Sequence, residues 1–270
     1  MYKKWPALPF LICLIAGTVI PLFVIGYYGF TDKSGAFTLA NITAIFGREH
    51  AKALLLALLL AAVSTALSLV ISLPLALILR TSRLSRTGFM VFIFILPMWM
   101  NFLLRTMAWQ VLLERTGPIS SLIAALGFRP PQMINTPGAV ILGMIYDFLP
   151  FMVLPIYNVM EKIDEDLIEA AYDLGAGRAK VFFSVILPLS VPGIASGITM
   201  VFVPALTTFV ISTMLGGGKI QLIGNIIEQE FTVSANWNLG SGLSLVMMVF
   251  IVFSMACLSR LDKNKEGELL

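Results

Sequence analysis

Long apolar runs are the feature that most constrains this chain. An α-helix needs about 20 consecutive apolar residues to cross the hydrocarbon core of a bilayer. The sequence holds about six runs of roughly that length, at residues 8–30, 53–79, 89–113, 139–160, 189–215 and 243–258. Hydrophobic residues make up 58% of the chain and charged residues only 12%, whereas a soluble domain carries about 25% charged residues. We therefore expect an all-α membrane protein with about six transmembrane helices.

The first run follows Lys3 and Lys4, and a basic start before an apolar stretch is also typical of a secretory signal. The run is long, and no clear small-residue cleavage site follows it. A transmembrane helix is the favoured interpretation. Since no linker divides the later runs, we expect one transmembrane domain over residues 1–270.

The connections between the runs predict the orientation, because cytoplasmic connections carry an excess of Lys and Arg. Of the 18 basic residues, one lies inside a run, Arg105. Eleven fall on one side: Lys3, Lys4, Arg80, Arg83, Arg86, Lys162, Arg178, Lys180, Arg260, Lys263 and Lys265. Six fall on the other side: Lys33, Arg48, Lys52, Arg115, Arg129 and Lys219. This difference predicts that both termini are cytoplasmic.

The sequence lacks the residues that several enzyme classes require. A single histidine, His50, excludes the two-histidine zinc motif of metalloproteases. The Gly-Lys pair at 218–219 has Thr213 and Ile220 where a phosphate-binding loop requires glycine and a hydroxyl residue. The net charge of +3 gives no reason to expect a nucleic-acid partner. We therefore expect no catalytic residue, no metal site and no cofactor in this chain.

The connection at 161–188 is too long for a tight turn, and it is patterned as EKIDEDLIEAAYDLGAGRAKVFFSVILP. Acidic residues at 164–166 predict a helix start, where they meet the positive end of the helix dipole. Gly175 predicts a left-handed stop, and Pro188 is expected to break a second short helix before the fifth run. An apolar stripe comprises Leu167, Ala170, Ala171 and Leu174, and a separate acidic ridge comprises Glu165, Glu169 and Asp173.

The shallow stripe suits a helix that lies in the groove of a partner protein. The alternative is a helix that rests on the lipid surface. Anionic headgroups would repel the acidic ridge, so the pattern favours a protein partner.

The same connection resembles a known family signature. Glu169-Ala170-Ala171, Gly175 and Ile186-Leu187-Pro188 are similar to the EAA loop of bacterial binding-protein-dependent ABC importer permeases. The resemblance implies an ATPase-coupling loop at 161–188 within the membrane domain. Its implied coupling residues are Glu169, Ala170, Ala171, Asp173, Gly175, Leu187 and Pro188.

Three further stretches resemble the B-type permeases of spermidine/putrescine importers in particular. They are PMWMNFLLR at 97–105, LPFMVLPIY at 149–157, and GGGK with LIGN between 216 and 225. The resemblance implies a polyamine cargo and a location in the bacterial inner membrane. It also implies three partners: an ATP-binding subunit, expected as a dimer, a second homologous permease chain, and an extracytoplasmic solute-binding protein.

Two ionisable residues lie inside apolar runs, Arg105 and Asp147. Each costs about 2.5–3.5 kcal/mol at a helix centre, so such residues usually face a cavity or a partner. Trp99, Asn101, Trp109 and Asp147 are our candidates for a cation pathway, because carboxylates and tryptophan faces attract organic cations. Alternatively, Arg105 and Asp147 pair with one another, and the tryptophans anchor the chain at the membrane interface.

We expect one permease subunit of an ATP-driven importer that works by alternating access, with ATP hydrolysis in a separate subunit. A permease for another small solute is an alternative. A stand-alone secondary transporter would need more charged or polar residues in mid-span and would leave the loop at 161–188 unexplained. An intramembrane hydrolase is a third alternative, because Gly240-Ser241-Gly242 weakly resembles a serine site, but His50 lies in a different region.

Overall fold

The computed structural model describes residues 8–81 and 96–266. In these ranges the chain is helical between short connections, with one isolated β-bridge between Thr31 and Phe37. The long helices are α4 (Arg48–Thr81), α8 (Pro137–Met160), α12 (Val191–Thr207) and α15 (Trp237–Glu266). The shorter elements are α1 (Leu8–Leu14), η2 (Ile15–Val19), α2 (Ile20–Gly29), α3 (Ala40–Thr43), η3 (Ala44–Phe46), η5 (Leu96–Trp99), α6 (Phe102–Leu113), α7 (Pro118–Ala125), α9 (Glu165–Asp173), α10 (Arg178–Val181), η6 (Phe182–Ile186), α11 (Leu187–Leu189), α13 (Val210–Gly216) and α14 (Ile223–Thr232).

Among the described residues, four helices are long and apolar enough to cross a membrane. They cover Pro9–Gly29, Arg48–Thr81, Pro137–Met160 and Trp237–Cys257. A fifth span is possible from Arg178–Leu189 and Val191–Thr207, which meet at a bend of 66°. The predicted helical membrane fold is therefore confirmed, and its helix count is roughly right. Residues 82–95 lie outside the described residues, and with them the first part of the predicted third span, residues 89–95.

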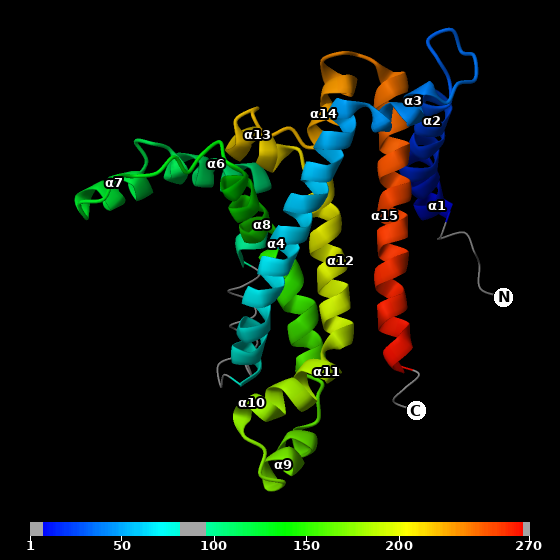
Figure 1. The fold of residues 1–270 in the computed structure, drawn as a ribbon. Coiled ribbons are helices and arrows are strands. Elements are labelled where there is room, and N and C mark those ends of the chain that lie inside the picture. Colours follow the sequence, from blue (N-terminus) through cyan, green and yellow to red (C-terminus); the bar gives the residue numbers. More distant parts are fainter. Residues whose placement is uncertain (1–7, 82–95, 267–270) are drawn as a thin grey trace, which may run out of the picture.

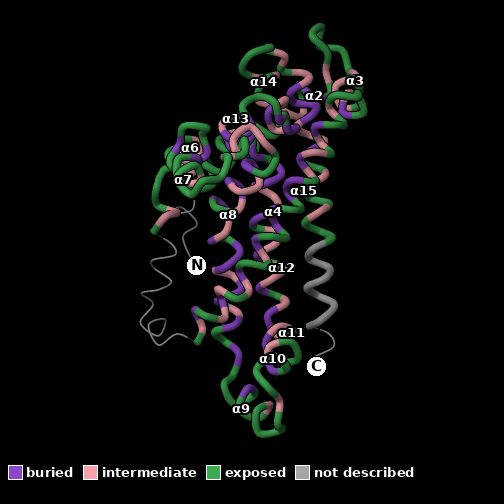
Figure 2. Tube along the Cα trace, turned by 60° about the vertical axis from the view of Figure 1, so that its left-hand side comes forward, coloured by how far each residue is buried: buried purple, intermediate pink, exposed green. Residues whose placement is uncertain are grey.

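The spans form two groups (Figure 1). Helices α4, α8 and α12 run side by side and pack on one another, while α15 packs mainly on α2. The segment α9–α10 projects from one end of the bundle, and α3, α13 and α14 lie at the other end. The α8 span is the most buried of the candidate spans, and the N-terminal one is the least buried. Figure 2 shows buried residues along much of α8.

Small residues allow α12 to approach α8 closely. A β-carbon at Gly193 would lie 2.7 Å from the carbonyl oxygen of Pro155, and one at Gly197 would lie 3.1 Å from that of Met152. In a membrane, helices associate through close packing of small residues because lipid tails are as apolar as the side chains. The glycine pair at 193 and 197 therefore sets the distance between these two spans.

The bend before α12 is not where the sequence predicts it. Pro188 lies inside the short helix α11, and the helical path bends at Ser190 instead. The cause is Pro192, at the start of α12, because a proline has no N–H for the helix ladder and its ring disturbs the preceding turn. The buried hydroxyl of Ser190 donates to the carbonyl oxygen of Ile186 over 2.6 Å, which stabilises the bend.

The predicted fifth span at 189–215 is also wrong in extent, because the helix is interrupted. Helix α12 ends at Thr207, Thr208 takes an extended conformation, and α13 begins at Val210. Figure 1 shows α13 beside the end of α12 rather than in line with it.

Asn225 satisfies the polar groups at this interruption. Its amide nitrogen donates to the carbonyl oxygen of Phe209 over 3.0 Å and to the Thr213 hydroxyl over 2.8 Å. Its side-chain oxygen accepts from the Leu222 backbone N–H over 3.0 Å and from the Ser212 hydroxyl. Because Asn225 is 5% exposed, these bonds stabilise a break that would otherwise leave buried polar groups unpaired.

Candidate functional site

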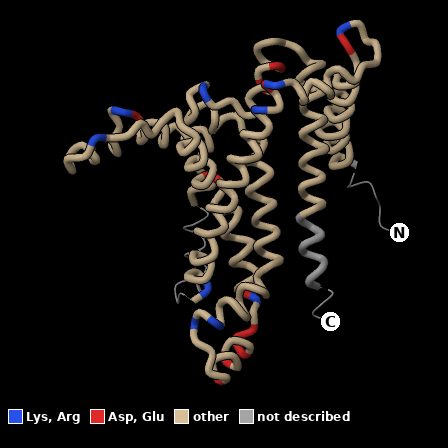
Figure 3. The backbone as a smooth tube through the Cα atoms, viewed as in Figure 1, with Lys and Arg blue, Asp and Glu red and all other residues tan. Residues whose placement is uncertain are grey.

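Helix α9 begins as the sequence predicts. Asp164 is its N-cap, and one side-chain oxygen accepts from the backbone N–H of Asp166 over 3.2 Å. Glu165 and Asp166 follow in the first turn, where the helix dipole favours negative charge. Figure 3 shows acidic residues gathered at this projecting end of the molecule.

Helix α9 ends in a Schellman motif that explains the spacing of the signature. Gly175 has a φ of +78°, and its N–H donates to Tyr172 O over 2.8 Å. The N–H of Ala176 donates to Ala171 O over 3.1 Å. These are the two hydrogen bonds of the motif, which places its glycine four residues after the first carbonyl acceptor. The separation of Ala171 from Gly175 is therefore a requirement of the backbone geometry.

The predicted apolar stripe faces mostly away from the rest of the chain. Leu167 and Leu174 are 52% and 89% exposed, and Ala170 is also exposed. On the inner side of α9, Ile168 is buried and Ala171 is partly buried against the core. The acidic ridge, Glu165, Glu169 and Asp173, is exposed as well. One apolar surface and one acidic surface are thus exposed on a projecting helix.

Two other predicted coupling residues lie where this projection joins the membrane bundle. Leu187 is half-buried and Pro188 is exposed, both in α11. The preceding turn, η6, is a π-helix in which Leu187 N–H donates to Phe182 O. This connection leads through Ser190 into α12.

A buried ion pair lies between α6 and α8. Arg105 Nε is 3.4 Å from Asp147 Oδ1, with side chains 8% and 1% exposed. The Thr106 hydroxyl donates to Asp147 Oδ2 over 3.2 Å. Neither Arg105 Nε nor Asp147 Oδ1 makes a hydrogen bond within the described part of the chain. The structure therefore brings the two ionisable residues together, as expected if Arg105 and Asp147 form an ion pair.

The aromatic candidates are not brought together on one helix. Asn101 is the N-cap of α6, where its side-chain oxygen accepts from Leu103 N over 2.8 Å. Since this cap separates η5 from α6, the predicted span at 89–113 is not one continuous helix, and Trp99 and Trp109 lie in different elements. Trp99 is 78% exposed in η5. Trp109 packs edge-on against Tyr146, the neighbour of Asp147, with ring centroids 5.3 Å apart.

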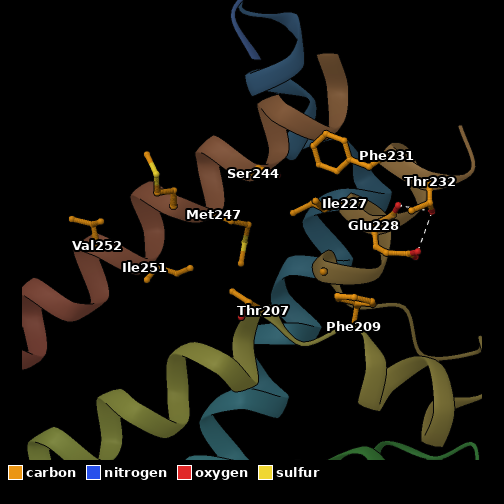
Figure 4. A pocket seen from close by; sticks show the side chains of 12 residues that line it. Thr207, Phe209, Ile227, Glu228, Phe231, Thr232, Ser244, Met247, Ile251 and Val252 are labelled. Atoms are coloured by element: carbon orange, nitrogen blue, oxygen red, sulfur yellow. Dashed lines mark hydrogen bonds between the residues drawn. The ribbon is translucent and has the colours of Figure 1, made fainter. Parts of the chain in front are cut away.

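A cavity that the sequence does not predict lies between the end of α12, α14 and α15 (Figure 4). Its volume is about 510 Å³, and apolar side chains such as Phe209, Ile227, Phe231 and Met247 line most of it. Glu228 is the acid on its lining, and the carboxylate accepts from the Thr232 hydroxyl over 3.0 Å. Thr207 and Phe209, on either side of the interruption, contribute to the lining, and the uniform hydropathy of residues 189–215 gives no sign of that interruption.

Gly240 and Gly242, which flank Ser241, allow close packing. A β-carbon at Gly242 would lie 2.5 Å from Asn41 Cβ, and one at Gly240 would lie 3.1 Å from the Phe231 ring. His50 Nδ1 lies 2.7 Å from the carbonyl oxygen of Ala44. These contacts account for both glycines and for the histidine without a hydrolytic site.

A family model described as the binding-protein-dependent transport system inner membrane component matches residues 68–266. The chain belongs to this family. The matched region contains the whole of the loop at 161–188 and the spans on either side of it. As an ABC importer permease, the chain is a membrane component of a transport system, and the resemblance found in the signature residues is confirmed.

Two relatives are similar over much of their length. The chain is 35% identical over 266 residues to the spermidine/putrescine transport system permease protein PotB of Haemophilus influenzae, covering 95% of this chain and 93% of that protein. It is 36% identical over 184 residues to the PotB of Escherichia coli, covering 67% of each. A bacterial alginate ABC transporter, solved with an alginate-pentasaccharide-bound periplasmic protein, contains a chain with a TM-score of 0.81 at 15% identity. That match covers 97% of this permease and 95% of the other chain, and it shows the fold.

Proposed function

We propose that this permease imports a polyamine of the spermidine/putrescine type, by alternating access between the two sides of the inner membrane. The observation that carries the cargo is the 35% identity to a spermidine/putrescine permease over 95% of the chain. Another small solute is the alternative cargo. The alginate transporter has the same fold at 15% identity, so the fold alone does not select a cargo.

We infer that α9 docks into a separate ATP-binding subunit, expected as a dimer, which hydrolyses ATP. The exposed Leu167, Ala170 and Leu174 offer an apolar face, and Glu169 and Asp173 offer charge beside it. An amphipathic helix with such a face suits a groove in a partner protein. A lipid surface is a poorer match, since Glu165, Glu169 and Asp173 are all exposed next to the stripe.

The proposed docking implies an orientation for the whole chain. With α9 in the cytoplasm, the helix ends and connections nearest to it, within the described residues, carry Arg80, Lys162, Arg178 and Lys180. Both termini are then cytoplasmic, and the end with α3, α13 and α14 faces an extracytoplasmic solute-binding protein. A second homologous permease chain completes the membrane part, and residues 1–270 act as a single transmembrane domain.

For the pathway, we propose that Asp147, Trp109, Trp99 and Asn101 line part of the route of the cationic cargo. Asp147 supplies a carboxylate inside the membrane, and Trp109 lies against its neighbour Tyr146. A cation that approaches Asp147 competes with Arg105, so each contact is transient. Transient contacts suit a route that must also release its cargo.

ATP hydrolysis by the reconstituted complex tests the proposal. The complete complex is assembled in vesicles and presented with the solute-binding protein, loaded in turn with spermidine, putrescine, an amino acid or an oligosaccharide. We expect the polyamine-loaded protein to stimulate hydrolysis most. Equal stimulation by every solute, or selective stimulation by a non-polyamine, contradicts the proposed cargo.

A further inference from the structure

Arg80 lies at the end of α4 and reaches the turn that carries α9. Its Nη2 donates to the carbonyl oxygen of Ile163 over 3.0 Å. Ile163 is itself 8% exposed and lies between α8 and α9. The same Nη2 is 3.8 Å from Oε1 of Glu165, the first residue of α9. One guanidinium group thus joins the end of a span to the start of the projecting helix.

The hydrogen bond is the stronger of these two contacts. The Glu165 side chain is 74% exposed, and solvent-exposed ion pairs at such distances contribute little. The Arg80 side chain is only 8% exposed, although it stands at a charged end of the molecule. A hydrogen bond from a charged and nearly buried donor is both stronger and more directional than an exposed ion pair.

A cavity of about 740 Å³ separates the parts that Arg80 connects. Leu77, Ile78 and Thr81 of α4 line one side, and Ile168 and Tyr172 of α9 line another. Where a cavity intervenes, side chains do not interdigitate, so packing alone transmits a displacement poorly. A bridging group with fixed geometry is needed there.

We propose that Arg80 is a positioning residue that transmits movement of α9 to α4, and through α4 to the bundle with α8 and α12. This inference rests on the proposed coupling of α9 to an ATPase subunit. When the partner displaces α9, the bond to Ile163 pulls the end of α4 with the turn. Without that bond, α9 moves against the cavity, and α4 follows only through its packing on α8.

Arg80 has a simpler possible role, because a cation near a helix C-terminus also stabilises that helix. The two roles differ in what they change. A stabilising charge alters how much complex assembles, whereas a transmitting bond alters how much cargo moves for each ATP hydrolysed. Lysine keeps the charge and one donor toward Ile163, while glutamine removes the charge.

The experiment compares Arg80→Gln, Arg80→Lys and the control Thr81→Val in the reconstituted complex, with spermidine transport and ATP hydrolysis measured together. Thr81 lines the same cavity, but its hydroxyl donates within α4, to Leu77 O over 3.0 Å. We expect Arg80→Gln to lower transport per ATP about fivefold or more at an unchanged amount of complex. Arg80→Lys recovers most of that loss, and Thr81→Val matches the wild type.

The inference is overturned if spermidine transport per ATP hydrolysed in Arg80→Gln stays within about twofold of the wild-type value. It is also overturned if Thr81→Val lowers transport per ATP as much as Arg80→Gln does. Less complex with an unchanged ratio also overturns it, because that result assigns Arg80 to stability. If the wild-type chain binds no ATPase subunit, the proposed function itself fails. The two failures are therefore distinguishable.

Discussion

The backbone N–H of Ala176 donates to the carbonyl oxygen of Ala171 over 3.1 Å, and this bond closes the end of α9. It requires Gly175 between them to adopt a φ of +78°. Since a β-carbon at Gly175 would meet nothing within 4 Å, the conformation alone favours glycine there. The signature spacing thus follows from how the helix stops.

Replacing Gly175 tests this reading of the signature. Gly175→Val places a β-branched residue in the left-handed region, at a cost of about 1–2 kcal/mol. We expect it to reorient the end of α9 and to lower transport at normal membrane levels. Gly175→Asn is the matched control, because asparagine tolerates this conformation. Transport by the valine variant equal to that of the asparagine variant would argue against a conformational role.

The pair of Arg105 and Asp147 allows a test that separates transport from structure. Asp147→Asn alone leaves a nearly buried arginine unpaired, which costs about 3–5 kcal/mol, whereas replacing both partners by neutral side chains leaves no unpaired buried charge. We expect the double variant Arg105→Gln with Asp147→Asn to recover the protein level but not polyamine uptake. Recovery of uptake together with protein level would make the pair structural.

Trp109→Leu keeps apolar bulk and removes the ring that packs on Tyr146. A cation contact with tryptophan contributes roughly 0.5–2 kcal/mol, so we expect a severalfold loss of polyamine uptake in cells. A pull-down of the ATPase subunit in parallel should be unchanged. Loss of both together would indicate that Trp109 holds α6 in place.

The sequence predicts α9 well because its determinants are local. Asp164 caps the start, Gly175 stops the end, and both signals lie within a few residues of the bonds they make. The family resemblance likewise depends on a local pattern, which the match to residues 68–266 bears out.

The interruptions inside apolar runs could not be predicted in the same way. A hydropathy profile cannot show that Asn101 caps α6 or that α12 ends at Thr207. The second break depends on Asn225, which lies 16 residues beyond the carbonyl of Phe209 that it binds. The pairing of Arg105 with Asp147 depends on how α6 meets α8, so the sequence leaves both pairing and pathway roles open.

Close packing of α8 on α12 is testable at Gly197. A β-carbon there would lie 3.1 Å from Met152 O, and larger side chains in such contacts cost about 1–3 kcal/mol. We expect Gly197→Val to lower the thermal stability of the purified permease. Gly26→Val in α2 is the control, because a β-carbon there meets nothing within 4 Å. An equal effect of both changes would contradict the packing account.

Reporter fusions test the orientation. Fusions after Gly175 should report the cytoplasm, and fusions near Gly35, Arg129 and Ser234 should report the outside. The prediction follows from the excess of Lys and Arg on the α9 side of the membrane. An outside signal at Gly175 would be incompatible with docking of α9 to a cytoplasmic ATPase.

Co-purification of the ATPase subunit with a Leu174→Lys variant tests the central claim most directly. Leu174 is 89% exposed, so the change disturbs no packing within the chain, but it places a charge on the apolar stripe. Leu126→Lys is the control, since Leu126 is 66% exposed and follows α7 at the opposite end of the molecule. We predict that Leu174→Lys loses the ATPase subunit at a normal membrane level while Leu126→Lys retains it. Retention of the subunit by both variants would contradict the docking of α9.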